Sequence, residues 1–437
     1  MEILSPGKKI KILRKKIGLR QDQLTDARIT RSLISMIENG KRRLNRKTAM
    51  IIAVKLNDYY KNLGQEITPE YLLESEEKQA SNIIEENIES LRPILKNKKE
   101  VDHQHVFEIL KSMIELAEKW NLPDKKAEIL LVRGKYYFDK KQFNLAIADY
   151  YNSLEYYLSS KEEAKIALLY VKISKCYIFM AQFDQAAFYG EKAFSLSRES
   201  KISNSNEIKA KALLNKIICY YRTNRYDLTL QEIEKFKNIK YVNESLNDEV
   251  TLLEANTFYS LKNYEKARKI YERLLNREGK VELHVMLPVY DHIAKLYSKI
   301  GELSKAREIL QRAILQRERI ADEEYLATFL LEIAKCYYGI NDHEGVLKLL
   351  SEIMLISEQE ILREADLADT YILAAKIYLG RQNYNEAEEY LLKSQYYLEK
   401  DSISEKLNEV YSLLGELYCD LGNINATKVY FQKIRNN

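Results

Sequence analysis

The chain has 437 residues, of which 46% are hydrophobic, so it is long enough to form two or three domains with substantial cores. It contains only 13 glycines and 5 prolines, and this scarcity of turn-forming residues argues against a β-rich protein and favours an almost wholly helical one. No uncharged apolar run approaches the roughly 18 residues that a membrane span requires, and the first residues lack a hydrophobic signal segment. We therefore expect a cytoplasmic protein with no membrane partner.

Positive charge is concentrated at the amino terminus. Residues 1–60 hold 15 lysines and arginines against 5 aspartates and glutamates, a net charge of +10, although the whole chain carries only +4. The remaining residues therefore carry about −6. This asymmetry is expected when contacts with nucleic-acid phosphates are confined to one end of a molecule. The alternative is a small basic helical bundle without a nucleic-acid partner.

Residues 7–56 have the spacing of a helix-turn-helix. Thr30 can cap a short helix over residues 31–38, and Gly40 can end it. Leu33, Ile34 and Ile37 give this helix an apolar inward stripe. Residues 21–25 are long enough for one scaffold helix ahead of it, with Leu24 as the contact between the two helices. The outer side of the second helix then carries Arg31, Ser32, Ser35 and Met36.

A longer set of residues matches a known pattern, namely Ile10, Leu13, Arg14, Gly18, Leu19, Gln21, Leu24, Ile34, Ser35, Ile37, Glu38, Gly40, Ile52 and Ala53. Together they resemble the DNA-binding domain of the Xre and phage-repressor family. In that family Arg14 matches a position that pairs with the acid at Glu38. The turn between Leu24 and Thr30 departs from the common repressor form, because it is one residue shorter and has no glycine.

The resemblance implies that the exposed side of the second helix reads base edges while flanking groups hold backbone phosphates. We assign base reading to Arg31, Ser32 and Met36. Arg31 is the foremost of these, since a guanidinium can bond a guanine edge at two points. The expected phosphate-binding residues are Gln21, Asn39, Lys41, Arg42, Arg46 and Lys47.

Most of the remaining sequence is built from a repeat of 38 to 43 residues. An aromatic or apolar residue, here called the anchor, opens the second helix of each unit, at Phe143, Phe183, Tyr226, Tyr264, Leu303, His343, Tyr384 and Ile424. A small or β-branched residue follows three positions later, and an aromatic residue precedes each anchor by six. The pattern resembles the tetratricopeptide repeat. Stacked pairs of this kind build one continuous core, and Cys176, Cys219 and Cys336 recur in it as buried packing residues.

The position eight residues before each anchor should face the groove that the first helices line. It is occupied by Lys135, Lys175, Ile218, Asn256, Lys295, Lys335, Lys376 and Glu416. Apolar residues, Leu214 and Leu252 among them, lie one turn earlier, and Tyr221, Tyr259 and Tyr338 are candidate walls. Such a surface suits an extended peptide with a carboxylate, whose backbone Asn256 could bond. The alternative is that the lysines form only a solvated face.

We therefore predict an all-α protein with an Xre-type helix-turn-helix bundle over residues 1–64 and a linker over residues 65–75. A linking helical hairpin or degenerate repeat follows over residues 76–124, and a right-handed superhelical solenoid of eight to nine tetratricopeptide-like repeats includes residues 125–437. This architecture resembles the RNPP family of peptide-sensing regulators, nearest the NprR and PlcR types. The resemblance implies a quorum-sensing homodimer that binds a double-stranded DNA operator and a short signalling peptide.

Other classes of function are compatible with this architecture. A DNA-binding scaffold would respond to a protein partner and not to a peptide. A Rap-type regulator would capture a response regulator or another protein through its repeats, alone or as a second function, and Gln79 or Gln104 could then act on a phosphoryl group. An ordinary enzyme is not indicated, because phosphate loops, nucleophile elbows and dinucleotide turns are missing from the sequence. His103 and His105 cannot face one ion from a helix. We expect no metal, no cofactor and no catalytic residue.

Overall fold

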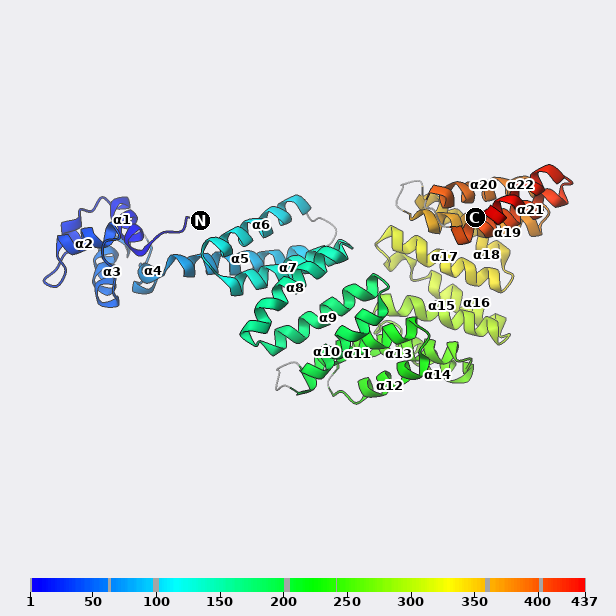
Figure 1. Ribbon diagram of the computed structural model, residues 1–437, viewed down its shortest axis with the longest axis horizontal. Helices are drawn as coiled ribbons and strands as arrows, with labels where there is room; N and C mark the ends of the chain where they lie inside the picture. Colours follow the sequence, from blue (N-terminus) through cyan, green and yellow to red (C-terminus); the bar gives the residue numbers. More distant parts are fainter. Residues whose placement is uncertain are drawn as a thin grey trace. The chain divides into compact units, whose positions relative to one another are not determined.

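The computed structural model describes residues 2–61, 64–96, 102–199, 205–240, 242–357, 362–400 and 404–436. Within these ranges all regular elements are helices, and a single isolated bridge joins Asp26 to Ile29. The chain divides into two compact units, Met1–Cys219 and Tyr220–Asn437, which are described separately below (Figure 1). Among the described residues, no helix is long and apolar enough to cross a membrane.

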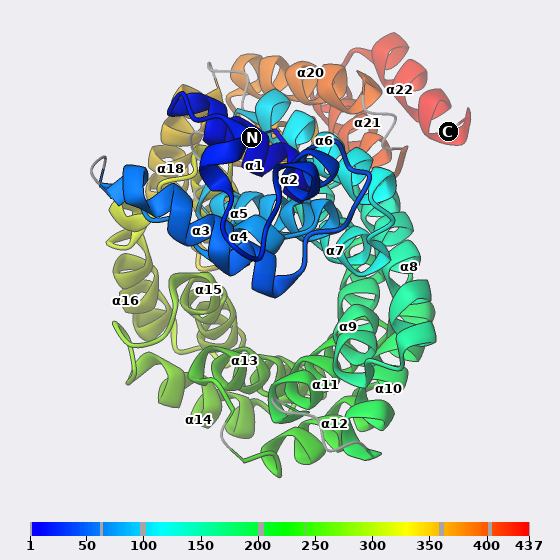
Figure 2. The same cartoon turned by 90° about the vertical axis from the view of Figure 1, so that its left-hand side faces the viewer.

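The first unit begins with a small helical bundle, coloured blue in Figure 2. Its elements are α1 (Pro6–Lys16), the 3₁₀ helix η1 (Gln21–Leu24), α2 (Arg31–Glu38), α3 (Arg46–Tyr60) and α4 (Pro69–Leu73). Ile10, Leu24, Ile34, Ile52 and Leu56 are fully buried in its core. The helix predicted over residues 31–38 is confirmed, with the Thr30 hydroxyl accepting a hydrogen bond from the Leu33 amide.

The predicted scaffold helix over residues 21–25 is shorter than expected. It is one turn of 3₁₀ helix that ends at Leu24, because the Thr25 amide and hydroxyl both donate to the Asp22 carbonyl. The Asp26 carboxylate then accepts from the amides of Arg28 and Ile29. These local side-chain bonds stabilise a turn in place of further helix.

The segment predicted as a linker, residues 65–75, contains α4. Thr68 caps this helix and Leu72 is fully buried in the core of the bundle. The domain boundaries proposed from the sequence nevertheless stay a prediction.

The rest of the first unit consists of longer helices. They are α5 (Glu76–Lys96), α6 (His103–Lys119), α7 (Pro123–Asp139), α8 (Phe143–Ser160), α9 (Glu163–Phe179) and α10 (Phe183–Glu199), followed by α11 (Ser205–Arg222). Consecutive helices from α5 to α10 contact each other in order.

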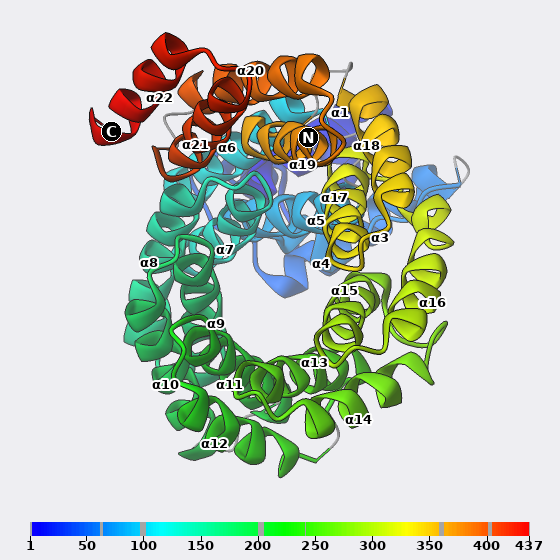
Figure 3. The same cartoon turned by 90° about the vertical axis from the view of Figure 1, so that its right-hand side faces the viewer.

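The second unit continues the pattern. Its helices are α12 (Tyr226–Lys237), α13 (Glu244–Ser260), α14 (Tyr264–Leu275), α15 (Leu283–Lys299), α16 (Leu303–Ile314), the 3₁₀ helix η3 (Arg317–Arg319), α17 (Glu323–Gly339), α18 (His343–Ser357), α19 (Glu364–Gly380), α20 (Tyr384–Lys400), α21 (Ser404–Asp420) and α22 (Ile424–Asn436). The first helices of successive repeat pairs form one layer, since α13 contacts α15, α15 contacts α17 and α17 contacts α19. The second helices of the pairs, such as α14 and α16, form the other layer (Figure 3).

The predicted repeat is confirmed, because every anchor is the first residue of the second helix in its pair. The residue two positions before each anchor has a positive φ, and these residues are Lys141, Ala181, Asn224, Lys262, Gly301, Asn341, Gln382 and Gly422. One left-handed residue in each turn lets the chain reverse between two antiparallel helices.

Packing within the pairs follows the repeat positions. The small residues after the anchors are fully buried from Ala146 to Ala387. Where the residue six positions after an anchor is also aromatic, the aromatic residue six positions before that anchor stacks on it, as Tyr177 does on Tyr189, Tyr378 on Tyr390 and Tyr418 on Tyr430. Cys176, Cys219 and Cys336 are buried, as predicted.

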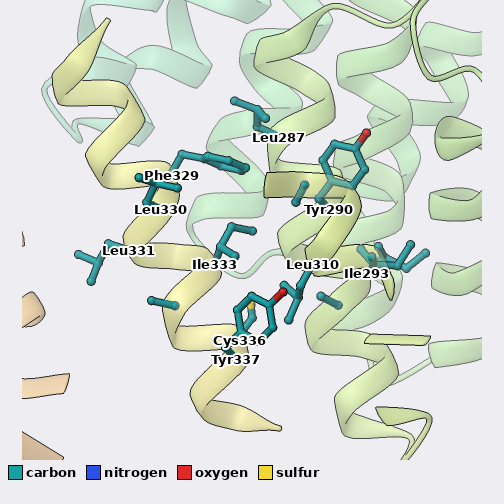
Figure 4. Close-up of a cluster of buried hydrophobic side chains, with 14 of the residues drawn as sticks. Leu287, Tyr290, Ile293, Leu310, Phe329, Leu330, Leu331, Ile333, Cys336 and Tyr337 are labelled. Carbon is teal, nitrogen blue, oxygen red and sulfur yellow. The ribbon is translucent and has the colours of Figure 1, made fainter. Parts of the chain in front are cut away.

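The largest core cluster lies in the second unit (Figure 4). Leu287, Tyr290 and Ile293 of α15 belong to this cluster together with Leu330 and Ile333 of α17, and all five are essentially inaccessible to solvent. Burial of this apolar surface is the main stabilising contribution to the stack of helices.

Candidate functional site

A buried ion pair fixes the position of α2 against α1. Arg14 Nε donates to Glu38 Oε1 at 2.7 Å and Arg14 Nη2 donates to Glu38 Oε2 at 2.9 Å. Arg14 also bonds the Leu19 carbonyl, and Gln21 Nε2 donates to Glu38 Oε2 at 2.8 Å. Although burial opposes it, these donors hold the pKa of Glu38 below its ordinary value. The predicted structural pair is thus present.

The residues assigned to base reading lie on α2. Arg31 and Ser32, at its amino-terminal end, are exposed, and Met36 is half-buried. An exposed amino-terminal end is the part of a recognition helix that contacts base edges. The structure therefore brings Arg31 and Ser32 together on an accessible surface.

Most of the predicted phosphate-binding residues flank this helix. Asn39, Lys41 and Arg42 follow its carboxyl end, and Arg46 and Lys47 open α3, and all five are exposed. Arg46 lies 3.3 Å from Glu70 in an exposed ion pair that contributes little to stability. Gln21 differs from this group, because its amide nitrogen is bonded to Glu38.

Two side chains hold the end of α4 and the start of α5 against the amino-terminal residues of the bundle. The buried Lys9 ammonium donates to the carbonyls of Tyr71 and Glu74 and lies 3.0 Å from the Glu74 carboxylate. The Gln79 amide bonds both the nitrogen and the oxygen of Leu4, at 3.1 and 2.7 Å. The side chain of Gln79, a candidate for phosphoryl chemistry, is thus engaged in a structural contact.

In the second unit the predicted peptide-facing lysines are joined to carboxylates. Lys295 pairs with Asp291 and Glu332, Lys335 with Glu332 and Asp369, and Lys376 with Glu409, over distances of 2.7 to 3.2 Å. Lys406 pairs with Asp369 from the next first helix. Although burial opposes the shift, Lys335 and Lys295 lower the pKa of Glu332. These lysines and acids form a ladder of ion pairs across α15, α17, α19 and α21.

Asn256 lies beside Tyr271 at the start of this unit. The Tyr271 hydroxyl donates to Asn256 Oδ1 at 2.7 Å, and Asn256 is 7% exposed. Its Nδ2 forms no hydrogen bond in the part of the chain that the structure describes. The amide therefore keeps a donor for a ligand, while its acceptor is already used.

The predicted tyrosine walls pack on their own anchors. Tyr221 lies against Tyr226, Tyr259 against Tyr264 and Tyr338 against His343, with ring centroids 5.6 to 6.1 Å apart. All three are half-buried, as is Leu252, whereas Leu214 is buried. These side chains shape the surface of the first helices and leave part of each ring accessible.

In the first unit, Lys135 and Lys175 are exposed. Lys135 pairs with Asp139 of its own helix, and the Lys175 ammonium lies 5.6 Å from the Phe138 ring centroid. Sequence reasoning missed Lys172, which is half-buried three residues before Lys175. The helical spacing of the two lysines was a usable signal, because residues at i and i+3 share a face. Among the described residues, no group of three or more His, Cys, Asp or Glu side chains is placed to hold a metal ion.

Comparisons with known proteins agree with both parts of the fold. A helix-turn-helix family model matches residues 10–59, and tetratricopeptide repeat models match residues 250–279 and 287–318. The apo form of the quorum sensor NprR from B. thuringiensis is similar in fold, with a TM-score of 0.53 and 15% identity over 82% of this chain and 99% of that one. The chain therefore combines an Xre-type helix-turn-helix with tetratricopeptide repeats, and its fold is similar to that of NprR.

Rap proteins are also similar to this chain. The regulatory protein RapF of Bacillus subtilis (strain 168) is 25% identical over 271 residues, which cover 60% of this chain and 67% of RapF. The response regulator aspartate phosphatase E of the same organism is 20% identical over 64% of this chain and 79% of its own length. The apo form of RapI has a TM-score of 0.52 at 15% identity, covering 90% of this chain and 98% of RapI.

Proposed function

We propose that this chain is a cytoplasmic transcription regulator that binds operator DNA through its helix-turn-helix and is switched by a short signalling peptide bound to its repeats. The combination of a helix-turn-helix model match over residues 10–59 with exposed Arg31 and Ser32 on α2 carries the proposal. The net charge of +10 over residues 1–60 supplies the attraction to phosphates.

The proposed switch depends on the layer that the first helices of the repeats form. A peptide that contacts several first helices at once favours whichever arrangement brings them closest. Lys9 holds the end of α4 against α1, and Gln79 holds the start of α5 against Leu4, so a movement of α5 would be passed to the DNA-binding bundle and α2. In a homodimer, such a movement would change the spacing of two recognition helices, which must match half-sites about 34 Å apart or multiples of it. Peptide binding would thereby raise or lower the affinity for the operator.

Selection from a random double-stranded DNA library tests this function with the full-length protein. We expect enrichment of one two-fold symmetric sequence, since a dimer reads two half-sites, and loss of that enrichment in Arg31→Ala. Adding pools of synthetic short peptides should then change the retained fraction of the selected DNA. A library that stays random with the wild-type protein, in the presence and absence of peptides, would refute DNA recognition.

A second candidate is a Rap-type action on a response regulator, favoured by the similarity to RapF and to the aspartate phosphatase E. Gln79 is engaged with Leu4, whereas Gln104 is exposed on α6, where it donates to Glu108 at 2.7 Å. Gln104 is thus the accessible amide of the two. Phosphate release from a panel of phosphorylated receiver domains, measured with wild type and with Gln104→Ala, separates this function from DNA binding. A rate equal to that of the receiver domains alone would exclude it.

A further inference from the structure

Four lysines from three successive first helices form a cluster in the first unit. They are Lys135 of α7, Lys172 and Lys175 of α9, and Lys211 of α11, here called the lysine cluster. Figures 2 and 3 show these three helices following one another in one layer. Lys135 pairs with Asp139 and Lys211 with Glu207, each within its own helix at 2.5 Å. Among the described residues, Lys172 and Lys175 form no hydrogen bond and no ion pair.

Lys172 is the centre of the cluster. Burial, together with the positive charges of Lys135, Lys211 and Lys175, lowers its pKa to about 8. Its ammonium lies 5.7 Å from the ring centroid of Tyr150, which belongs to α8 and is 2% exposed. A bound anion stabilises a cation in this setting, because burial has already removed part of the cation's hydration.

The space for this tyrosine depends on Gly134 of α7. A Cβ atom at Gly134 would lie 2.5 Å from Cε1 of Tyr150, so a side chain there would displace the ring. The glycine thus lets Tyr150 lie close beneath Lys172. A rigid aromatic ring under a lysine limits the positions that the ammonium can adopt.

The same repeat position carries the opposite charge in the second unit. Lys172 precedes its anchor, Phe183, by 11 residues, and Glu332 precedes its anchor, His343, by the same number. Glu332 is held by Lys335 of its own helix and Lys295 of the preceding first helix, at 2.9 and 3.2 Å. In the lysine cluster, Lys175 and Lys135 occupy the positions of Lys335 and Lys295, but a third lysine replaces the glutamate. The arrangement that holds a carboxylate in the later repeats therefore lacks its own carboxylate here.

We propose that the lysine cluster binds a carboxylate of the peptide ligand, either an aspartate or glutamate side chain or the free carboxyl terminus, with Lys172 as the principal partner. This inference rests on the proposed peptide binding by the repeats and names the ligand group that one face of them recognises. A carboxylate is favoured over other anions because the equivalent lysines of the second unit hold one. The cluster selects acidic peptides, and the paired lysines of the ladder do not.

Affinity selection with the full-length protein tests the site. One pool of random seven-residue peptides contains aspartate and glutamate and has free carboxyl termini; the other contains neither residue and is amidated. Bound peptides are identified by mass spectrometry with wild type, Lys172→Met, Lys175→Met and, as the control, Lys269→Met. Lys269 lies on the second helix α14, outside the layer of first helices, and pairs with Glu265 of its own helix.

We expect the wild type to retain peptides from the first pool only. Their affinity should fall at least about tenfold in Lys172→Met, as for the loss of one charge-assisted bond, and should fall in Lys175→Met, whose exposed site tolerates substitution. Lys269→Met should bind as the wild type does. Equal retention from both pools, or unchanged affinity in Lys172→Met, would overturn the carboxylate site while leaving peptide binding in place. Retention from neither pool would overturn peptide binding itself, and the site with it.

Discussion

Arg14 and Glu38 join α1 to α2, the second helix of the helix-turn-helix, by two hydrogen bonds within a buried ion pair. Removing one member leaves the other charge buried and unpaired, which costs about 3–5 kcal/mol. We expect Arg14→Met to lower the local stability of α1 and α2 by about that amount, seen as faster amide hydrogen exchange there. The control, Arg46→Met, removes an exposed ion pair. It should change the free energy of local opening that exchange reports by less than about 1 kcal/mol. Wild-type exchange in Arg14→Met would show that the pair does not hold the bundle together.

The same pair gives the bundle a defined response to acid. Arg14 and Gln21 lower the pKa of Glu38 from its ordinary value of 4.5, against the effect of burial. A carboxyl group with a lowered folded pKa stabilises the fold above its unfolded pKa and loses this contribution as pH falls through the folded value. We therefore expect the protection of amides in α1 and α2, measured as their exchange relative to the intrinsic rate at each pH, to fall below about pH 4.5 in the wild type. In Arg14→Met the unpaired, buried Glu38 should reverse the trend, and an identical acid response in both proteins would contradict the assignment.

The turns within the repeat pairs can be tested with opposite substitutions. Ala181 has a φ of 56°, whereas Gly301 occupies the equivalent turn with a φ of 81°. A left-handed alanine costs about 1 kcal/mol relative to glycine, so Ala181→Gly should stabilise its pair by about that amount. Gly301→Ala should destabilise its own pair similarly, since a Cβ there meets no neighbour and only the backbone is strained. Hydrogen exchange of the amides in each helix pair measures these two changes in stability. Changes of the same sign in the two variants would contradict the left-handed conformation assigned to both positions.

Lys172 should reduce stability in the absence of a ligand. Its folded pKa of about 8 lies below the ordinary 10.5, so the charged form is disfavoured in the folded state. This cost is fully present below pH 8 and disappears as pH rises towards 10.5. We expect Lys172→Met to raise the free energy of unfolding at pH 7 by about 1 kcal/mol or more. This difference between the variant and the wild type should become small near pH 10. Urea unfolding measures this against Lys376→Met, and a loss of stability at pH 7 would contradict an unpaired lysine.

Sequence periodicity was sufficient to locate the helices but not the charges between them. Each anchor from Phe143 to Ile424 opens a helix as predicted, because helix boundaries depend on local aromatic and small-residue spacing. The partners of Lys295 and Lys335 could not be predicted in this way. Glu332 and Asp369 come from neighbouring helices about 35 residues away, and their contact depends on how two helices are offset along their axes.

In the helix-turn-helix, too, local features could be predicted from the sequence, and contacts between distant residues could not. Thr30, Ile34 and Gly40 predicted α2 to the residue, since caps and apolar stripes are local signals. The attachment of the bundle through Lys9 and Gln79 was missed, because a lysine and a glutamine on helix surfaces ordinarily face water. Their partners lie more than 60 residues away in sequence, and only the packing of α1 against α4 brings them close.

DNA binding by the purified full-length protein tests the central claim most directly. Fluorescence anisotropy with its own upstream region, at two salt concentrations, compares wild type with Arg31→Ala. We predict saturable, sequence-selective binding that weakens as salt increases, because phosphate contacts release counterions, and that loses selectivity in the variant. Equal affinity for the upstream region and for unrelated DNA, with no difference between the two proteins, would contradict the account and leave protein capture by the repeats as the remaining function.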